Sequence, residues 1–229
     1  MWSTILHTCG PSEPSQELNN VLEYLNDWAV TNKMRFNVKK TKEMVFNFSR
    51  YNNTPPPMLL LNGNEVEQVS ESKILGVVLQ SDLKWNAHVT MITKKANKRL
   101  HLLRLCKKAG VIPTDLVMIY TSIVRSVLEY CCVVWHPSLP NYLQIEVERI
   151  QKRALAIIYP HIDYEQSLQK SKLKTLFERR EVQCKKVFIN MQKASHELHN
   201  LLPTLTYDFH SFVFHSFIYS SYQYIAYNE

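Results

Sequence analysis

The chain has 229 residues, of which 45% are hydrophobic and 21% are charged, a composition that supports a folded core and argues against general disorder. No apolar run reaches the roughly 18 residues of a membrane span, and the first residues lack the regions of a signal peptide. We therefore expect an intracellular protein, in the cytoplasm or nucleus. Lysine and arginine total 27 against 20 acidic residues, and this excess favours polyanionic partners such as nucleic acid.

Residues 12–79 are expected to form a helix followed by short strands. Ser12-Glu13-Pro14 suits the start of a helix. The apolar residues that follow recur at helical spacing, namely Leu18, Val21, Leu22, Leu25 and Trp28. Apolar residues then alternate over 36–38 and 44–48, which predicts strands.

Two further strand signals follow Pro55-Pro56-Pro57. Asn62-Gly63 predicts a hairpin turn that joins two short strands, and residues 73–79 predict one buried strand. This first block therefore predicts an α+β structure.

Residues 85–159 are expected to be helical. The first helix has an apolar stripe made of Val89, Ile92, Ala96, Leu100 and Leu103, and Gly110 suits its end. A second, largely apolar helix is predicted over about 114–134. A third is predicted over 142–158, and its predicted inner face is formed by Leu143, Val147, Ile150, Ala154 and Ile157.

The last block begins near Tyr164. Thr175 and Glu178 are spaced as in a capping box, which predicts a helix start. The predicted packing side of this helix is formed by Leu176, Val182, Val187 and Met191. Residues 207–229 are rich in aromatic residues and nearly uncharged, and we expect this tail to be poorly ordered and prone to aggregation if exposed.

Taken together, these patterns predict an α+β, mainly α fold, in which short strands precede a helical bundle. We expect three parts: residues 1–82 with a helix and short strands, a helical domain over 83–206, and the aromatic tail over 207–229.

The positive charge is concentrated on the predicted helix that precedes Gly110. Residues 84–108 contain eight lysines and arginines and no acidic residue. On a helical wheel, the side opposite the apolar stripe carries Lys94, Lys95, Lys98, His101 and Lys108, which we call the basic face. Solvated helices usually mix charges of both signs, so an unpaired cationic face favours an external anion over a merely solvated surface.

Motifs for catalysis and metal binding are weak. Five cysteines without CxxC or CxxH spacing predict free thiols, and the chain has no GxGxxG, P-loop, HExxH or GxSxG motif. His161-Ile162-Asp163 has the spacing of an iron oxygenase ligand pair, but three-residue patterns arise by chance. We expect no metal, no cofactor and no small-molecule substrate.

Residues 28–46, WAVTNKMRFNVKKTKEMVF, resemble the W…N.M.LN..KT..M.F signature of reverse transcriptases from non-LTR, LINE-like retrotransposons, except that Phe36 replaces the usual leucine. KILGV at 73–77 and DLKWNAH at 82–88 resemble the primer-grip strand and the thumb entry of that family. SVLEYC at 126–131 and IEVERIQKRA at 145–154 resemble the helices that follow.

This resemblance, over roughly residues 3–202, implies the end of a polymerase palm and a thumb-like domain, beginning just after the catalytic Asp-Asp box. Two-metal nucleotidyl transfer needs those carboxylates, so we expect a non-catalytic fragment that at most binds a template–primer duplex. The predicted contact residues are Lys40, Lys94, Lys95, Lys98, Arg99 and Lys108; Lys40 matches a lysine placed near pyrophosphate in the family.

Two alternatives remain open. Residues 88–128 are also similar to a helical segment at the N-terminus of the AlkB-type dioxygenase–methyltransferase that modifies transfer RNA, which implies a helical RNA-binding module. The chain is alternatively an idle, degenerate reading frame. The sequence does not indicate an oligomeric state or a preference between DNA and RNA.

Overall fold

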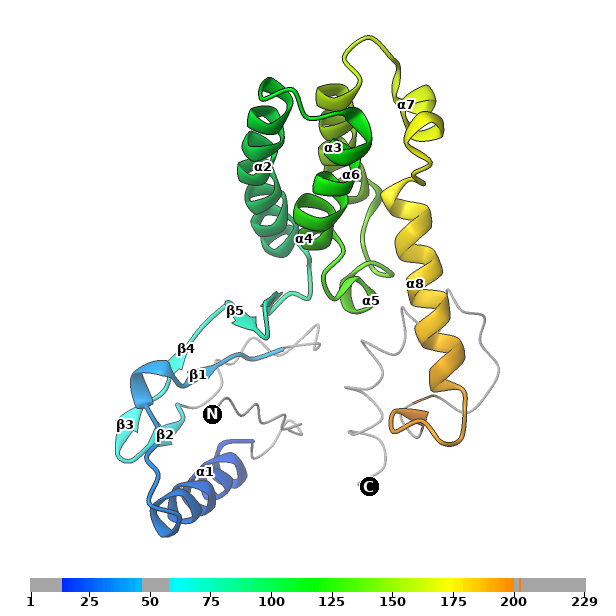
Figure 1. Cartoon of the computed structure of the whole chain (residues 1–229). Helices are drawn as coiled ribbons and strands as arrows, with labels where there is room; N and C mark the ends of the chain where they lie inside the picture. Colours follow the sequence, from blue (N-terminus) through cyan, green and yellow to red (C-terminus); the bar gives the residue numbers. More distant parts are fainter. Residues whose placement is uncertain (1–13, 47–57, 200–201, 203–229) are drawn as a thin grey trace. The chain divides into compact units, whose positions relative to one another are not determined.

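A computed structural model describes residues 14–46, 58–199 and 202 of the chain. The described residues divide into two compact units, one ending at Lys84 and the other beginning at Trp85. Figure 1 shows the helices and short strands in chain order. The predicted assignment of residues 1–82 and 83–206 to a palm end and a thumb-like domain stays a prediction, and the predicted tail lies outside the described residues.

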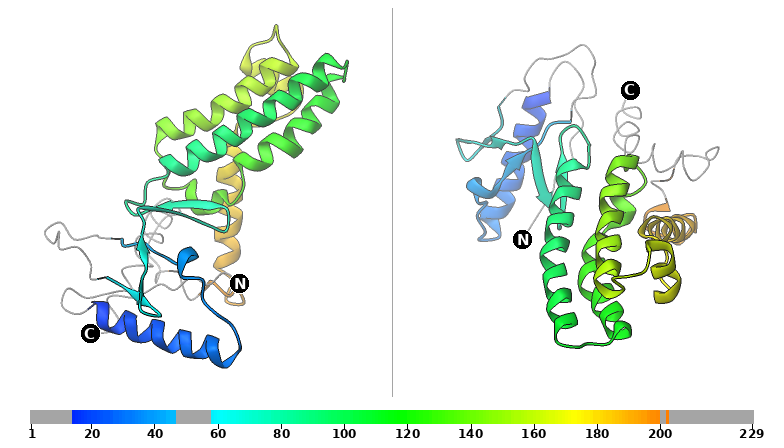
Figure 2. Two further views of the ribbon diagram at one scale, coloured as in Figure 1. Left: turned by 90° about the vertical axis from the view of Figure 1, so that its left-hand side faces the viewer. Right: turned by 90° about the horizontal axis from the view of Figure 1, so that it is seen from above.

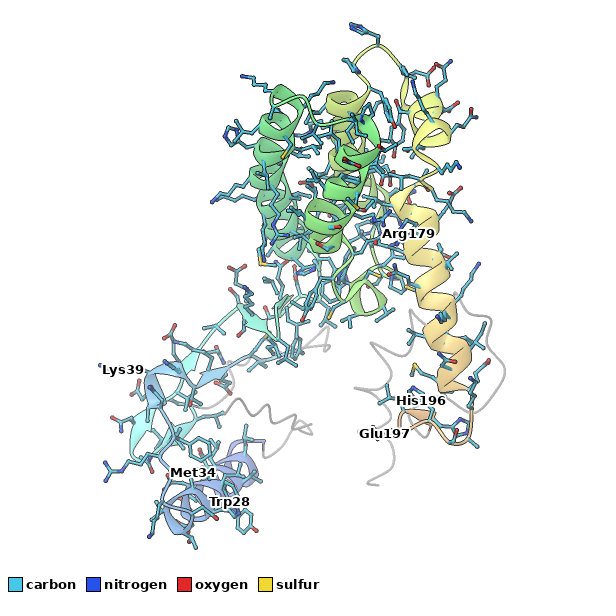
Figure 3. The ribbon with its side chains drawn as sticks, in the orientation of Figure 1. Trp28, Met34, Lys39, Arg179, His196 and Glu197 are labelled. Carbon is cyan, nitrogen blue, oxygen red and sulfur yellow. The ribbon has the colours of Figure 1, made fainter. Side chains whose placement is uncertain are left out.

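The first unit is built around α1 (Pro14–Thr31) and a small apolar cluster. Leu22 of α1 packs in this cluster with Leu59, Leu61 and Val66. The side chain of Asn19 ties α1 to the strands, because its Oδ1 accepts a hydrogen bond from the amide of Leu60 at 3.2 Å. Trp28, one of the apolar residues at helical spacing, is exposed on α1 (Figure 3).

Within the described residues, six short strands form three separate pairs. β1 (Lys42–Glu43) pairs in parallel with β4 (Glu67–Gln68), and β2 (Leu60–Leu61) pairs antiparallel with β3 (Asn64–Glu65). The predicted turn between β2 and β3 is confirmed. Asn62 and Gly63 have φ angles of 54° and 72°, as the right-handed twist of a two-residue hairpin requires.

Residues 73–79 do not form the predicted buried strand. They belong to a second antiparallel hairpin, made of β5 (Glu71–Ile74) and β6 (Val77–Gln80). Leu75 and Gly76 form its turn with φ angles of 48° and 92°, and the Leu75 side chain is 79% exposed. A leucine-glycine turn has no polar residue to mark it, so the apolar run conceals the reversal of the chain.

The strand predicted over residues 36–38 is also absent. Val38–Lys40 forms a short 3-10 turn, η1, because the side chain of Asn37 accepts a hydrogen bond from the amide of Lys40. This local capping bond outweighs the β preference of the flanking apolar residues. Of residues 44–48, Met44 to Phe46 are not in a strand, and Phe48 lies outside the described residues.

The second unit is helical. Its long elements are α2 (Asn86–Lys108), α6 (Asn141–Ile158) and α8 (Leu176–Met191), joined through α3 (Pro113–Ile119), η2 (Tyr120–Arg125), α4 (Ser126–Leu128), α5 (Cys132–Trp135) and α7 (Tyr164–Ser171). α2 packs along α6 and along the α3–α4 segment, as the two views of Figure 2 show. The predicted α+β, mainly α fold is confirmed.

The apolar stripe predicted for α2 forms the centre of this unit. Val89, Ile92, Ala96, Leu100 and Leu103 are all at most 3% exposed. Most of the predicted inner face of α6 is buried as well, but Ile157 is half-buried and its neighbour Ile158 is buried instead. α2 ends as predicted, with Gly110 at a φ of 85°.

The single helix predicted over 114–134 is interrupted twice. Residues 120–125 widen into the π-helical turn η2, and Cys131 adopts a left-handed φ of 51° before α5. The backbone groups freed at these breaks find partners elsewhere. The guanidinium of Arg99 donates to the carbonyl of Ile123, and the indole of Trp135 donates to the carbonyl of Tyr130 at 3.0 Å.

The predicted start of α8 is confirmed, and its predicted packing side is confirmed at Leu176, which is fully buried, but wrong at Val182. Thr175 caps α8 by accepting a hydrogen bond from the amide of Glu178. Val182 is 57% exposed, whereas Arg180 is fully buried and Cys184 is 4% exposed. A buried arginine lies outside the apolar pattern from which the packing side was predicted.

Glu148 links three elements of the second unit. Its carboxylate on α6 accepts hydrogen bonds from the amide of Leu176 at the start of α8, from the hydroxyl of Tyr164 and from the side chain of Gln151. Burial, with the bond to Glu148 next in importance, raises the pKa of Tyr164. The carboxylate also lies where the helix dipole of α8 favours negative charge.

Replacing Glu148 with Ala should lower the free energy of unfolding by about 2–4 kcal/mol, because the amide of Leu176 and the hydroxyl of Tyr164 lose a charged acceptor. Glu148→Gln keeps one acceptor oxygen without the charge and should lose less. Urea unfolding followed by circular dichroism measures both variants. Equal losses for Ala and Gln would show that the charge, and not the acceptor, carries the effect.

Candidate nucleic-acid interface

The basic face of α2 is exposed along its whole length. Lys94, Lys95, Lys98, His101 and Lys108 are all exposed, while the opposite side of the helix is buried. At a rise of about 1.5 Å per residue, the stretch from Lys94 to Lys108 is about 21 Å long. In the described part of the chain, no carboxylate lies within ion-pair distance of its four lysines. Their charges are therefore available to an external anion.

Two other cations of α2 have structural contacts. Arg99, which was also predicted to bind nucleic acid, is half-buried and donates to the carbonyl of Ile123. Lys107 donates to the carbonyls of Ile157 and Ile158 at the end of α6, where a positive charge is favoured by the helix dipole. Both side chains hold neighbouring elements against α2, whereas the lysines of the basic face and Arg104 are exposed.

α6 extends the cationic surface in a way that the sequence reasoning missed. Arg149, Lys152 and Arg153 are exposed on α6, and the guanidinium of Arg153 donates to the side-chain oxygen of Asn97 on α2 at 3.0 Å. This bond places Arg153 at the edge of α2, next to the basic face. The i, i+4 spacing of Arg149 and Arg153 was the available signal, but only the packing of α6 on α2 joins the two sets of charges.

Lys40 lies in the first unit, at the last position of η1, where its side chain is exposed and its amide donates to Asn37. Lys39, labelled in Figure 3, precedes it in the same turn. The structure thus gives Lys40 an exposed position, and its role in binding remains a prediction from the resemblance alone.

The described aspartates lie on separate segments of the chain, and two of them have local structural roles. Asp82 accepts a hydrogen bond from the amide of Lys84, which lowers its pKa. Asp163 caps α7 by accepting from the amide of Gln166, which accounts for the aspartate of the His161-Ile162-Asp163 motif. Among the described residues, no group of three or more histidine, cysteine or acidic side chains is arranged to hold a metal ion.

His196, labelled in Figure 3, lies in the turns after α8. His199 follows three residues later, also beyond the end of α8. The ring of His196 accepts a hydrogen bond from the amide of Leu198, and the ring of His199 lies 3.2 Å from the carbonyl of Met191. These local bonds support a structural role for both rings.

The interior of the second unit contains a buried arginine and two buried histidines, packed around the ring of Trp135. Arg180 donates from Nε to Nδ1 of His136 at 3.1 Å, and its guanidinium lies over the ring of Trp135. His88 also packs against Trp135, and the centroids of the two rings are 5.4 Å apart. Burial lowers the pKa of His88 to about 4, and burial together with the charge of Arg180 lowers the pKa of His136 to about 3.

Arg179, next to Arg180, is partly exposed and is paired with a carboxylate. It lies on α8, as labelled in Figure 3. Its guanidinium forms a bidentate ion pair with the carboxylate of Glu129, with nitrogen–oxygen distances of 2.7 and 3.1 Å. This hydrogen-bonded pair raises the pKa of Arg179. It joins α8 to the end of α4, where the helix is interrupted before α5.

Within the described residues, no helix combines the length and apolar character needed to cross a membrane.

The chain is 24% identical over 135 residues to a probable RNA-directed DNA polymerase from the transposon X-element of Drosophila melanogaster. The match covers 58% of the chain but only 14% of that polymerase. It supports a distant relationship to a retrotransposon polymerase.

The family described as the N-terminal part of alkylated DNA repair protein alkB homolog 8 matches residues 85–126. These residues extend from the start of α2 to the first residue of α4, and they include the whole basic face. No solved structure matches the chain.

Proposed function

We propose that the chain binds nucleic acid as a non-catalytic, thumb-like part of a retrotransposon RNA-directed DNA polymerase. The observation that carries this proposal is the exposed basic face of α2, whose four lysines lack an acidic partner among the described residues. The distant similarity to a transposon polymerase supports a template–primer duplex as the class of ligand that we propose.

The residues that we assign to binding are Lys94, Lys95, Lys98 and Lys108 of α2, with Arg149 and Arg153 of α6 beside them. Lys40 adds a contact from the first unit, and Arg99 supports the surface through its bond to Ile123. Lysine is a point charge without the planar fork used to read base edges, so its contacts are to phosphates. Binding should therefore tolerate many sequences and weaken steeply as salt is raised.

A labelled RNA–DNA hybrid titrated with the full chain at about 50 mM salt tests the proposal. Fluorescence anisotropy should show saturable binding that is lost as salt rises, with little difference between hybrids of unrelated sequence. Failure to bind any duplex or hybrid at low salt would contradict the proposal and favour an idle reading frame.

A second candidate function is favoured by the alkB homolog 8 family match over residues 85–126. In this case the same helices form a module that binds structured RNA, such as transfer RNA. The two candidates share the lysines of α2 but differ in ligand. Competition between unlabelled transfer RNA and the labelled hybrid separates them, because only an RNA-binding module should prefer the transfer RNA at equal nucleotide concentration.

The isolated chain should not extend a primer. Phosphoryl transfer by two metals requires clustered carboxylates, whereas Asp27, Asp82, Asp115 and Asp163 lie on separate elements. A primer-extension assay with Mg²⁺ or Mn²⁺ should give no product beyond that of a boiled sample. Templated incorporation above this background would contradict the expectation.

A further inference from the structure

His101 lies in the middle of the basic face of α2. Lys94, His101 and Lys108 follow one another at seven-residue intervals, so they lie along one line of the helix, with about 10 Å of axial rise between His101 and either lysine. All three side chains are exposed. Lys98 and Arg104, three residues before and after His101, are exposed as well. A nucleic-acid strand that reaches both Lys94 and Lys108 therefore passes over the imidazole.

The imidazole of His101 has no partner of its own. In the part of the chain that the structure describes, no hydrogen bond, ion pair or ring contact involves this ring. Residues 84–108 contain no acidic residue, so α2 itself supplies no countercharge. An external anion is therefore the partner available to a protonated ring.

The elements that pack on α2 leave His101 open to such an anion. Arg153 of α6 reaches α2 at Asn97, one turn before His101. Glu146 of α6 lies at the hydroxyl of Thr93, about 12 Å before His101 along the helix axis. The charged residues of the elements in contact with α2, from α3 to α6, are Asp115, Arg125, Glu146, Glu148, Arg149, Lys152 and Arg153. None of these described residues forms an ion pair with the ring.

We propose that His101 is a phosphate contact of the basic face in its protonated form, so that nucleic-acid binding takes up a proton and strengthens as the pH falls. This inference rests on the proposed function, because the phosphates belong to the nucleic acid that the lysines bind. An imidazole gains or loses its charge between pH 5 and pH 8, whereas lysine stays charged throughout this range. A phosphate beside the ring favours the charged form.

The effect of the proton on binding equals the effect of binding on the proton. If phosphate contact strengthens proton binding tenfold, protonation strengthens nucleic-acid binding by the same factor. For an ordinary imidazole, this coupling makes binding about fivefold tighter at pH 5.5 than at pH 7.5. It also corresponds to uptake of about 0.4 proton per bound chain at pH 6.5.

Two measurements on the full chain test the proposal. Fluorescence anisotropy with the labelled RNA–DNA hybrid, at one low salt concentration, gives the dissociation constant at pH 7.5, 6.5 and 5.5. Isothermal titration calorimetry at pH 6.5, in two buffers that differ in ionisation enthalpy, counts the protons taken up on binding. Circular dichroism checks that the chain is folded at each pH. We expect the fivefold tightening and the proton uptake given above.

Three variants identify the group that carries the proton. His101→Gln removes the titrating ring, and its affinity should change less than about twofold over the same pH range. His101→Lys fixes the charge, so it should bind at pH 7.5 about as tightly as the unaltered chain binds at pH 5.5. His196→Gln is the matched control, because His196 lies in the turns after α8 and not on α2 (Figure 3). It should keep the full pH dependence.

Equal pH dependence of the unaltered chain and of His101→Gln would overturn the proposal. Binding of the unaltered chain that does not change between pH 7.5 and pH 5.5 would overturn it too, as would a His101→Lys variant that binds no more tightly at pH 7.5. In each of these cases, saturable hybrid binding at pH 7.5 still supports the proposed function. Absence of hybrid binding at every pH would contradict both proposals, so the two failures are distinguishable.

Discussion

Replacing Lys94, Lys95 and Lys98 together with glutamine should flatten the dependence of log K on log salt by roughly 2 to 3 units. Each lysine that neutralises one phosphate contributes about 0.7–0.9 to this slope, because a phosphate contact releases condensed counterions. At about 0.1 M salt, a change of this size corresponds to roughly 100-fold to 1,000-fold weaker binding. Glutamine keeps the side-chain length and helix preference of lysine, so the variant isolates the charge.

A matched variant separates the position of these charges from their number. Lys170, Lys172 and Lys174 are exposed at the other side of the second unit, in and after α7. Replacing all three with glutamine lowers the net charge by the same amount, yet the slope should fall by less than one unit. Equal effects of the two triple variants would mean that net charge alone drives binding and that α2 forms only a solvated surface.

A second control tests the buried side of α2. Ile92 and Leu100 are 3% and 1% exposed, and truncation of either to alanine should lower the free energy of unfolding by about 2–5 kcal/mol through lost transfer energy and a cavity. The salt slope of the folded fraction should not change. A flattened slope in these variants would show that binding is sensitive to the fold of α2 and not to its charges.

Mild acid should destabilise the second unit through His88 and His136. Their pKa values in the folded protein, about 4 and about 3, lie below the ordinary value of 6.5. As the pH falls below 6.5, the unfolded chain binds protons that the folded chain does not, so stability is lost with falling pH. Together the two histidines should cost about 2 kcal/mol of unfolding free energy between pH 6 and pH 5.

This loss can be measured by urea unfolding followed through tryptophan fluorescence at several pH values, since Trp85 and Trp135 lie in the same core. His136→Gln can still accept the hydrogen bond from Arg180, and it should roughly halve the loss between pH 6 and pH 5. Replacing the exposed His161 in the same way should leave the loss unchanged. A pH dependence that His136→Gln does not alter would exclude His136 as its source.

Local sequence signals determined the elements that short-range chemistry controls. The Asn62-Gly63 turn was predictable because a two-residue hairpin needs positive φ angles that these residues tolerate. The Thr175 cap was predictable because its hydroxyl bonds an amide three residues away. The buried stripe and basic face of α2 were predictable because both follow from one helical period.

Tertiary packing decided the features that depend on distant partners. Arg99 was grouped with the exposed lysines of α2, and only the presence of the Ile123 carbonyl turns it inward. The burial of Arg180 could not be predicted from the sequence, because it relies on His136 and Trp135, which lie some 45 positions earlier in the chain. The cations of α6 joined the candidate site in the same way, since the Arg153–Asn97 bond exists only where two helices pack. The sequence by itself therefore determined which helix carries the charge, whereas the packed structure decided which charges face outward, because burial and pairing depend on residues that no local period reveals.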